Sequence, residues 1–143
     1  MQSSVAPLAE VSHDEVVDSV LSASRALVAV AARSLAAAEE HVTLAQYRAL
    51  VVLASRGRQR ALDLADALDV TQSTVTRMCD RLERKGLISR VRPADNRRIV
   101  VTAITAAGRQ LVDAVTRRRK REIRAILRRM TPEVRAAIGR AHV

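Results

Sequence analysis

Seven polar side chains between residues 71 and 81 could contact a nucleic acid. They comprise four hydroxyls, one amide and two guanidinium groups: Thr71, Gln72, Ser73, Thr74, Thr76, Arg77 and Arg81. Hydroxyls and amides can bond base edges and phosphates, and the fork of an arginine can bond O6 and N7 of guanine together. The combination predicts a surface suited to duplex DNA.

A helix would have to position these side chains, and the residues from Thr71 to Lys85 predict one. Its apolar residues recur every three or four positions and would form one buried stripe: Val75, Met78, Cys79 and Leu82. Thr71 is the predicted N-cap, because its hydroxyl can accept a backbone N–H that the first turn leaves unpaired. An ordinary surface helix would show the same periodicity. The short helical pattern before it, with Leu64, Ala65 and Leu68, favours a helix-turn-helix.

A basic hairpin is predicted directly after this helix. Residues 88–92 and 99–102 are rich in β-branched side chains, and the second run alternates with the period of a strand. Residues 93–98 contain proline, aspartate and asparagine, which favour a turn. Arg97 and Arg98 would lie at the tip, where a hairpin can enter a minor groove or follow phosphates. A solvated hairpin is the alternative, but the helix beside it favours contact.

The charge of the chain is unevenly distributed. The 143 residues have a formal net charge of +10. Residues 81–129 hold 16 Lys and Arg against 4 Asp and Glu, whereas residues 1–40 hold 2 against 6. This asymmetry predicts one half that faces DNA and one half kept away from it. The length suits a single domain, part of whose core a partner could complete.

The order of these motifs resembles that of the MarR family of winged-helix transcriptional regulators. The resemblance covers about residues 15–138 and is carried by residues 44–50, 64–71, 73–90 and 95–108. It implies a mainly α fold with a small two-stranded β-wing, a winged helix-turn-helix with N- and C-terminal dimerisation helices. The family pattern has an arginine in the wing. Its position in this chain is Arg97 when the pattern is aligned forward from Asp95, but Arg98 when it is aligned backward from Thr105 and Gly108. Both residues are therefore candidates.

The predicted helix-turn-helix and the basic hairpin are together called the reading head here. Long helical patterns flank it, at residues 14–40 and from Thr105 onward. Thr131, Pro132 and Glu133 predict the start of a last short helix, which we expect to end near residue 141, earlier than in the family pattern. The resemblance implies that these helices interleave with those of a second copy. Three parts then follow along the chain: an N-terminal dimerisation helix (1–40), the DNA-binding core (41–104) and C-terminal helices that complete the dimer interface (105–143).

Other chemically active residues do not form a second site in the sequence. Cys79 is the only cysteine, which excludes an intrachain disulfide, suits a reducing compartment and favours an inert core position. The three histidines share no metal-ligand spacing, so we expect no metal and no cofactor. Residues 117–121 are five consecutive basic residues within a helical pattern. We interpret them as a solvated helix face, with direct phosphate contact as the alternative.

The remaining patterns restrict location and function class. No apolar run approaches the roughly 20 residues of a membrane-spanning helix, and no signal-like core follows the N-terminus, so we expect a cytoplasmic protein with no membrane partner. No Ser/His/Asp set, paired carboxylates or phosphate-cradling glycine loop supports an enzyme.

The sequence thus predicts a homodimeric, sequence-specific, double-stranded DNA-binding regulator of transcription that recognises a pseudo-palindromic operator. The resemblance favours a repressor relieved by a small-molecule effector. A non-specific architectural DNA-binding protein is the alternative, favoured by the high basic charge. Tyr47 is the only aromatic residue and the one candidate for a ligand-binding side chain, so a pocket built on aromatic stacking is not expected.

Overall fold

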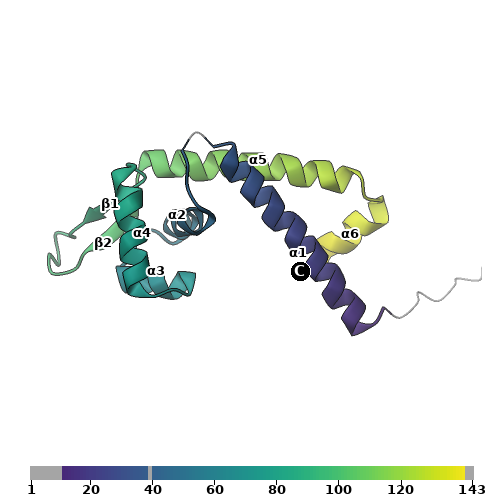
Figure 1. Ribbon diagram of the computed structural model, residues 1–143, viewed down its shortest axis with the longest axis horizontal. Coiled ribbons are helices and arrows are strands. Elements are labelled where there is room, and N and C mark those ends of the chain that lie inside the picture. The colour runs from purple at the N-terminus through teal and green to yellow at the C-terminus, as the bar shows by residue number, and fades with distance from the viewer. Residues whose placement is uncertain (1–10, 39, 141–143) are drawn as a thin grey trace, which may run out of the picture.

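The computed structural model describes residues 11–38 and 40–140. Its elements in chain order are α1 (His13–Ala36), α2 (Leu44–Arg56), α3 (Ala61–Leu68), α4 (Gln72–Arg84), β1 (Ile88–Val91), β2 (Val101–Ile104), α5 (Ala106–Arg128) and α6 (Pro132–Arg140). Figure 1 shows α2, α3, α4 and the two strands gathered at one end, while α1 and α5 extend away from them. The predicted mainly α architecture with a two-stranded wing is confirmed.

Hydroxyl side chains set where five of these helices begin. Each accepts a backbone N–H from the first turn that follows it: Ser12, Thr43, Thr71, Thr105 and Thr131. At Ser12 and Thr43 the side chain of the third helical residue returns the bond, completing a capping box. The caps predicted at Thr71 and Thr131 are confirmed. These bonds satisfy donors that a helix start leaves unpaired.

The first helix is shorter than predicted. It ends at Ala36 and not near residue 40. The N–H of Ala37 donates to Arg33 O at 3.2 Å, and the N–H of Ala38 donates to Leu35 O at 3.0 Å, which tightens the last turn. Leu35 is the last residue of α1 in the core, and the chain then turns so that Val42 packs against the same core. The alanine-rich pattern carried no signal of this turn.

The wing is an antiparallel pair whose register joins Ile88 to Ile104 and Val91 to Val101. The strands differ from the prediction in their bounds: β1 ends at Val91, before Arg92, and β2 runs from Val101 to Ile104, so it begins two residues after Ile99. The N–H of Ile99 donates to Asn96 O at 3.3 Å, so a turn bond occupies the donor that a longer strand would need. Gln59, from the α2–α3 loop, exchanges two backbone bonds of 3.0 and 2.7 Å with Thr102 and supports the inner edge.

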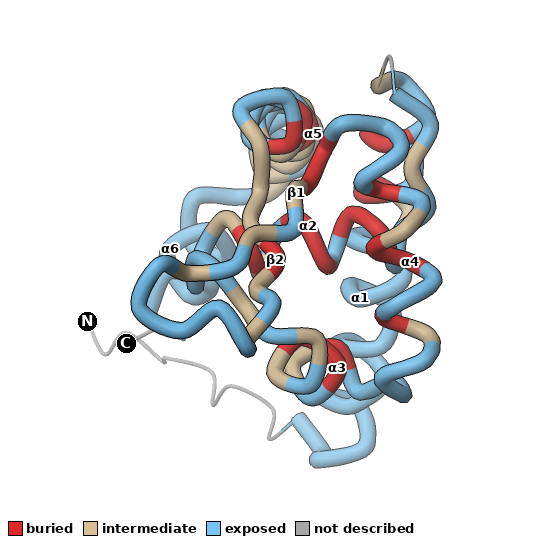
Figure 2. Tube along the Cα trace, turned by 90° about the vertical axis from the view of Figure 1, so that its left-hand side faces the viewer, coloured by how far each residue is buried: buried red, intermediate tan, exposed pale blue. Residues whose placement is uncertain are grey.

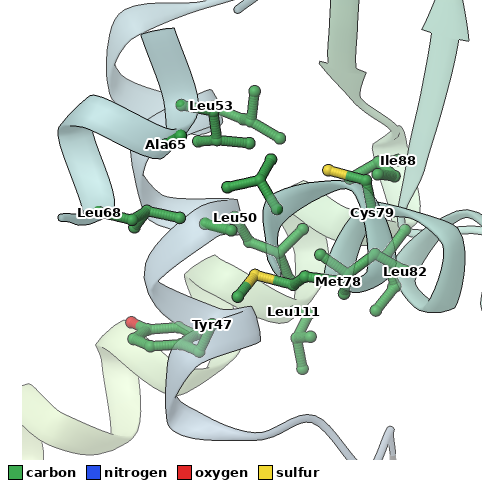
Figure 3. Packing of buried hydrophobic residues seen from close by; sticks show 14 of the residues in the cluster. Tyr47, Leu50, Leu53, Ala65, Leu68, Met78, Cys79, Leu82, Ile88 and Leu111 are labelled. Atoms are coloured by element: carbon green, nitrogen blue, oxygen red, sulfur yellow. The ribbon is translucent and has the colours of Figure 1, made fainter. Parts of the chain in front are cut away.

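One apolar core holds the reading head together. Figure 3 shows Leu50 and Leu53 of α2 meeting Met78, Cys79 and Leu82 of α4 and other residues from α3, β1 and α5. Figure 2 shows the buried segments turned inward in the elements around this core. Leu35 and Leu111 also belong to the cluster, so all three predicted parts of the chain contribute to it.

The junction between the wing and α5 predicts a sensitive position at Gly108. A Cβ there would meet the carbonyl oxygen of Leu87 and lie 2.7 Å from Ile104 Cγ1. That oxygen accepts the N–H of Thr105, so it cannot move without disturbing the start of α5. We expect Gly108→Ala to lower the free energy of unfolding by about 1–3 kcal/mol despite the better helix propensity of alanine, measured by urea denaturation.

Gly139→Ala is the matched control. No atom lies within 4 Å of a Cβ at Gly139, which is also helical and is exposed. This variant should be neutral or stabilised by up to about 1 kcal/mol. Equal stability of the two variants, at one protomer concentration, would contradict the steric argument.

Candidate nucleic-acid interface

A tight turn joins α3 to α4 and aligns the two helices. Asp69 adopts a left-handed conformation with φ of 56°, which short polar residues tolerate better than most. The N–H of Val70 donates to Ala65 O at 3.1 Å, closing the end of α3. Thr71 then starts α4, where its Oγ1 accepts the N–H of Thr74 at 3.2 Å. The predicted helix-turn-helix is therefore present.

The predicted inner stripe of α4 is confirmed. Val75 and Leu82 are completely buried, and Met78 and Cys79 are buried beside them. Burial raises the pKa of the Cys79 thiol, which keeps it protonated and unreactive near neutral pH. The structure therefore places Cys79 in the core as expected. With this side of α4 committed to the core, its other side must face outward.

The predicted contact residues of α4 lie together on that outward side. Thr74 is half-buried, whereas six are exposed: Thr71, Gln72, Ser73, Thr76, Arg77 and Arg81. The Thr71 hydroxyl lies 3.1 Å from that of Ser73 and 2.9 Å from that of Thr74. In the described part of the chain, no carboxylate pairs with Arg77 or Arg81. The guanidinium groups are therefore the strongest donors available to a ligand on this face.

The start of α2 lies beside these two arginines. A cavity of about 290 Å³ is lined by Thr43, Ala45 and Gln46 of the α2 N-terminus and by Thr74, Arg77, Met78 and Arg81 of α4. A helix N-terminus carries partial positive charge, and a guanidinium offers a planar set of donors, so this arrangement can hold an anionic oxygen. The sequence analysis missed Thr43 and Ala45, because about 30 residues separate them from Arg77.

An ion pair connects the outer face of α4 to the wing. Arg90 Nη2, on β1, lies 2.6 Å from Asp80 Oδ1, and Arg90 Nη1 lies 4.0 Å from Glu83 Oε1. The hydrogen bond to Asp80 raises the pKa of the Arg90 guanidinium further above its usual range. Two carboxylates that would repel a phosphate are thereby partly neutralised. The sequence pattern alone indicates no role for Arg90, because ten residues separate it from Asp80.

The wing places Arg97 and Arg98 at its exposed tip, as predicted. Arg92 Nη1 donates to Arg97 O at 3.0 Å, and the Arg98 N–H donates to Asn96 Oδ1 at 3.2 Å. These bonds hold the backbone of the tip and leave both predicted side chains exposed. Figure 1 shows the hairpin projecting beside α4, so wing and helix form separate parts of one outer surface.

Tyr47 lies in the apolar core and is only 3% exposed. It lines neither the cavity beside Arg77 nor the cavities along α1 and α5. Within residues 11–38 and 40–140, no group of three or more His, Cys, Asp or Glu side chains could hold a metal ion. None of the helices in these ranges is long and apolar enough to cross a membrane.

A sequence model of the MarR family matches residues 42–100, the segment that contains α2 to the end of the wing tip. The HTH-type transcriptional repressor MdtR of Bacillus subtilis is 36% identical over 70 residues, 49% of this chain and 45% of MdtR. The chain thus spans about half the length of the curated relatives it matches.

Solved structures extend the likeness to nearly the full chain. The crystal structure of RV1404 from Mycobacterium tuberculosis is 40% identical, has a TM-score of 0.87, and covers 95% of this chain and 93% of that one. A mutant of S. aureus MepR bound to an oligodeoxyribonucleotide shares the fold, with 23% identity, a TM-score of 0.70, and coverage of 92% and 94%. Together with the matching family model, the likeness to RV1404 shows that the chain belongs to the MarR family.

Proposed function

We propose that the protein is a sequence-specific regulator of transcription that binds duplex DNA as a homodimer. The outward face of α4 carries this proposal. Arg77 and Arg81 are exposed and pair with no carboxylate of residues 11–38 or 40–140, on a helix whose other face is buried in the core. Membership of the MarR family supports it, as does the oligonucleotide bound to MepR.

The candidate contacts divide into reading and positioning roles. Arg77 and Gln72 would meet base edges in the major groove, where arginine and glutamine have matched partners. The remaining candidates would hold the backbone or line the groove: Thr71, Ser73, Thr74, Thr76, Arg81, Arg97 and Arg98. Arg81 would share a phosphate with the N-terminus of α2. Phosphate contacts fix the register of a protein on its site and carry no sequence information themselves.

The homodimer is proposed because only the C-terminal half of α1 packs against the rest of its own protomer, whereas the apolar face of the helix continues into the N-terminal half. Val30, Ala31 and Leu35 are buried in the C-terminal half. Apolar residues on the same side of the N-terminal half are 46 to 63% exposed: Val16, Val17, Val20 and Leu21. A continuous exposed apolar face marks an interaction surface. A second copy of α1 presents the same face, as two-fold symmetry requires.

Two further features support this assembly. Val134 and Ile138 of α6 are exposed one turn apart, and α6 has no buried residue. Arg119 Nε is buried on α5 without a hydrogen-bond partner among the described residues, an arrangement that costs about 1–3 kcal/mol unless an acceptor is supplied. A second copy could supply one. We therefore retain residues 1–40 and 105–143 as the dimerisation parts and 41–104 as the DNA-binding part of a cytoplasmic protein.

The proposal includes repression that a small ligand relieves. A cavity of about 580 Å³ lies between the end of α1 and α5, with Leu87, Leu111 and Val115 in its lining and Lys85 and Arg118 also present. Its size suits a small molecule. Lys85 caps the C-terminus of α4, so an occupant there would touch the end of the reading helix. A thermal-shift screen of small aliphatic and aromatic carboxylates tests this part. The name of MdtR supports the repressor role.

A non-specific architectural DNA-binding role is the second candidate, because the chain carries a net charge of +10. The ratio of affinities for a selected and a scrambled duplex at one salt concentration separates the two roles. Specific regulators usually bind their sites about 10³- to 10⁷-fold more tightly than other sequences. A ratio near one would favour the architectural role.

Arg77→Ala tests the reading role directly. The variant should bind the preferred duplex about 1–3 kcal/mol more weakly and lose discrimination at one base-pair position, measured by fluorescence anisotropy on a set of single-substituted duplexes. Arg84→Ala is the control on the same helix, since Arg84 Nε donates to Asp80 O of its own helix at 3.2 Å. An Arg77→Ala variant that weakens every duplex equally would identify Arg77 as a phosphate contact.

Val20→Glu tests the dimer interface. Val20 is 63% exposed on the apolar face of α1, so a charge there should leave the fold intact but oppose burial against a second copy. Light scattering at micromolar concentration should give the mass of a dimer for the wild type and a monomer for the variant. Ser22→Glu, on the opposite side of α1, should remain dimeric. A monomeric wild type, with and without DNA, would contradict the assembly and the operator of two half-sites about 10 bp apart.

Arg97→Ala combined with Arg98→Ala tests whether the wing supplies affinity or reads sequence. Minor-groove patterns are degenerate, so the double variant should weaken binding to cognate and scrambled duplexes by similar factors. The slope of log affinity against log salt should become shallower by about one unit per lost contact. Arg135→Ala with Arg140→Ala removes the same charge from α6 as a control. Selective loss of cognate binding with an unchanged slope would show that the wing reads sequence.

A further inference from the structure

We propose that the outer face of α5 is a second binding surface, for the phosphate backbone of duplex DNA, separate from the reading face of α4 and the wing. The protein would then hold a second duplex segment while its reading head occupies the first. This inference goes beyond operator recognition, because it assigns the protein the capacity to bring two stretches of DNA together.

The surface is a row of five basic residues, here named the α5 basic stripe. Spacings of three and four place them on one side of the helix, and all are exposed: Arg117, Lys120, Arg121, Arg124 and Arg128. The row covers 11 residue steps, or about 16 Å of helix at 1.5 Å per residue. Gly108, Leu111 and Val115, the buried residues of α5, lie on the other side of the helix.

The stripe is not neutralised by its own chain. In the described residues, the ion pairs involve Arg33, Arg60 and Arg90 and none of the stripe. Glu122 lies within the same turns but pairs with Arg33 of α1 at 2.8 Å. A hollow of about 580 Å³ runs along the stripe and is lined only by Ala114, Arg118 and four stripe residues. Five like charges along one hollow repel each other, and an anion placed there relieves that repulsion.

The shape and chemistry of the stripe favour a nucleic-acid backbone. A row of about 16 Å is too long for one small anion, but suits successive phosphates. Four of its five residues are arginines, which can bond phosphate oxygens with two parallel N–H donors. A membrane-surface helix needs a broad apolar face next to its basic face. Among the large apolar residues of these turns, Ile123 and Leu127 are half-buried and only Ile126 is exposed, so no broad apolar face adjoins the stripe.

The stripe and the reading face point in different directions. Figure 2 views α5 close to its axis, at the top, with its buried segment turned toward the rest of the domain and its exposed side outward. In the same view α4 runs down the right-hand side, and its exposed segments face away from the core. A straight duplex lying on α4 would therefore leave the outer side of α5 open to a second one.

Capture of a second duplex tests the inference. Beads carry a biotinylated 40-bp duplex selected for binding, and a fluorescent 40-bp duplex of unrelated sequence is added with the full-length protein. The wild type should retain the fluorescent duplex on the beads, with a log–log salt slope for this capture of about −4 to −5. Arg121→Gln combined with Arg124→Gln and Arg128→Gln should stay bound to the beads but capture none. Arg117 is left unchanged because it also lines the cavity proposed for a ligand.

Arg48→Gln combined with Arg56→Gln and Arg58→Gln is the matched control, because it removes the same charge from exposed residues of α2 and the loop after it, outside α5 and the dimerisation parts. The control should capture as much fluorescent duplex as the wild type does. Circular dichroism should show that all three proteins are folded, and their molar masses in solution should show the same state of assembly. The inference is overturned if the wild type captures no second duplex or if both triple variants capture it equally well. It is also overturned if the stripe variant binds the bead-bound duplex with a shallower salt slope than the wild type, because the stripe would then contact the first duplex. Its failure is distinct from that of the proposed function, which fails when the wild type shows no sequence preference for the bead-bound duplex.

Discussion

The burial of one side of α4 is the constraint on which the rest of this structure depends. Val75 and Leu82 are completely buried in a core that α4 shares with α2, α3, β1 and α5, and Met78 and Cys79 complete the same stripe. A rotation of α4 by one residue step would expose these side chains and move charged neighbours toward the core, where an unpaired charge is strongly unfavourable. The hydrophobic core therefore determines which polar groups face outward, and with them the chemistry of the surface.

A second set of contacts connects this helix to the wing and to α5. Arg90, on the first strand of the wing, forms an ion pair with Asp80 of α4. Just beyond α4, Thr105 Oγ1 donates to Gly86 O at 2.6 Å and its N–H donates to Leu87 O, next to the close approach at Gly108. The end of the reading helix, the base of the wing and the start of α5 thus form one joint. A change in the direction of α5 would be transmitted to α4 through this joint, which would give the proposed relief of repression a physical route.

The basic residues of the chain serve three different purposes. Arg33, Arg60 and Arg90 pair with carboxylates and orient elements of the fold. Arg77 and Arg81 remain exposed on the reading face. The α5 basic stripe is exposed, and no carboxylate in the described part of the chain pairs with it. Net charge alone does not distinguish these groups, and this is why the high positive charge first favoured both a specific and a non-specific DNA-binding role.

The sequence by itself determined the elements, because helical periodicity, strand alternation and hydroxyl caps act between residues a few positions apart. It predicted α4, its buried stripe, its cap at Thr71 and the exposed wing tip correctly. The tertiary structure decided what depends on distant residues: where α1 stops, why β2 starts at Val101, which acid Arg90 neutralises, and that the N-terminus of α2 lies beside Arg77. Those contacts join segments tens of residues apart, and only the packing of α2 against α4 brings them together.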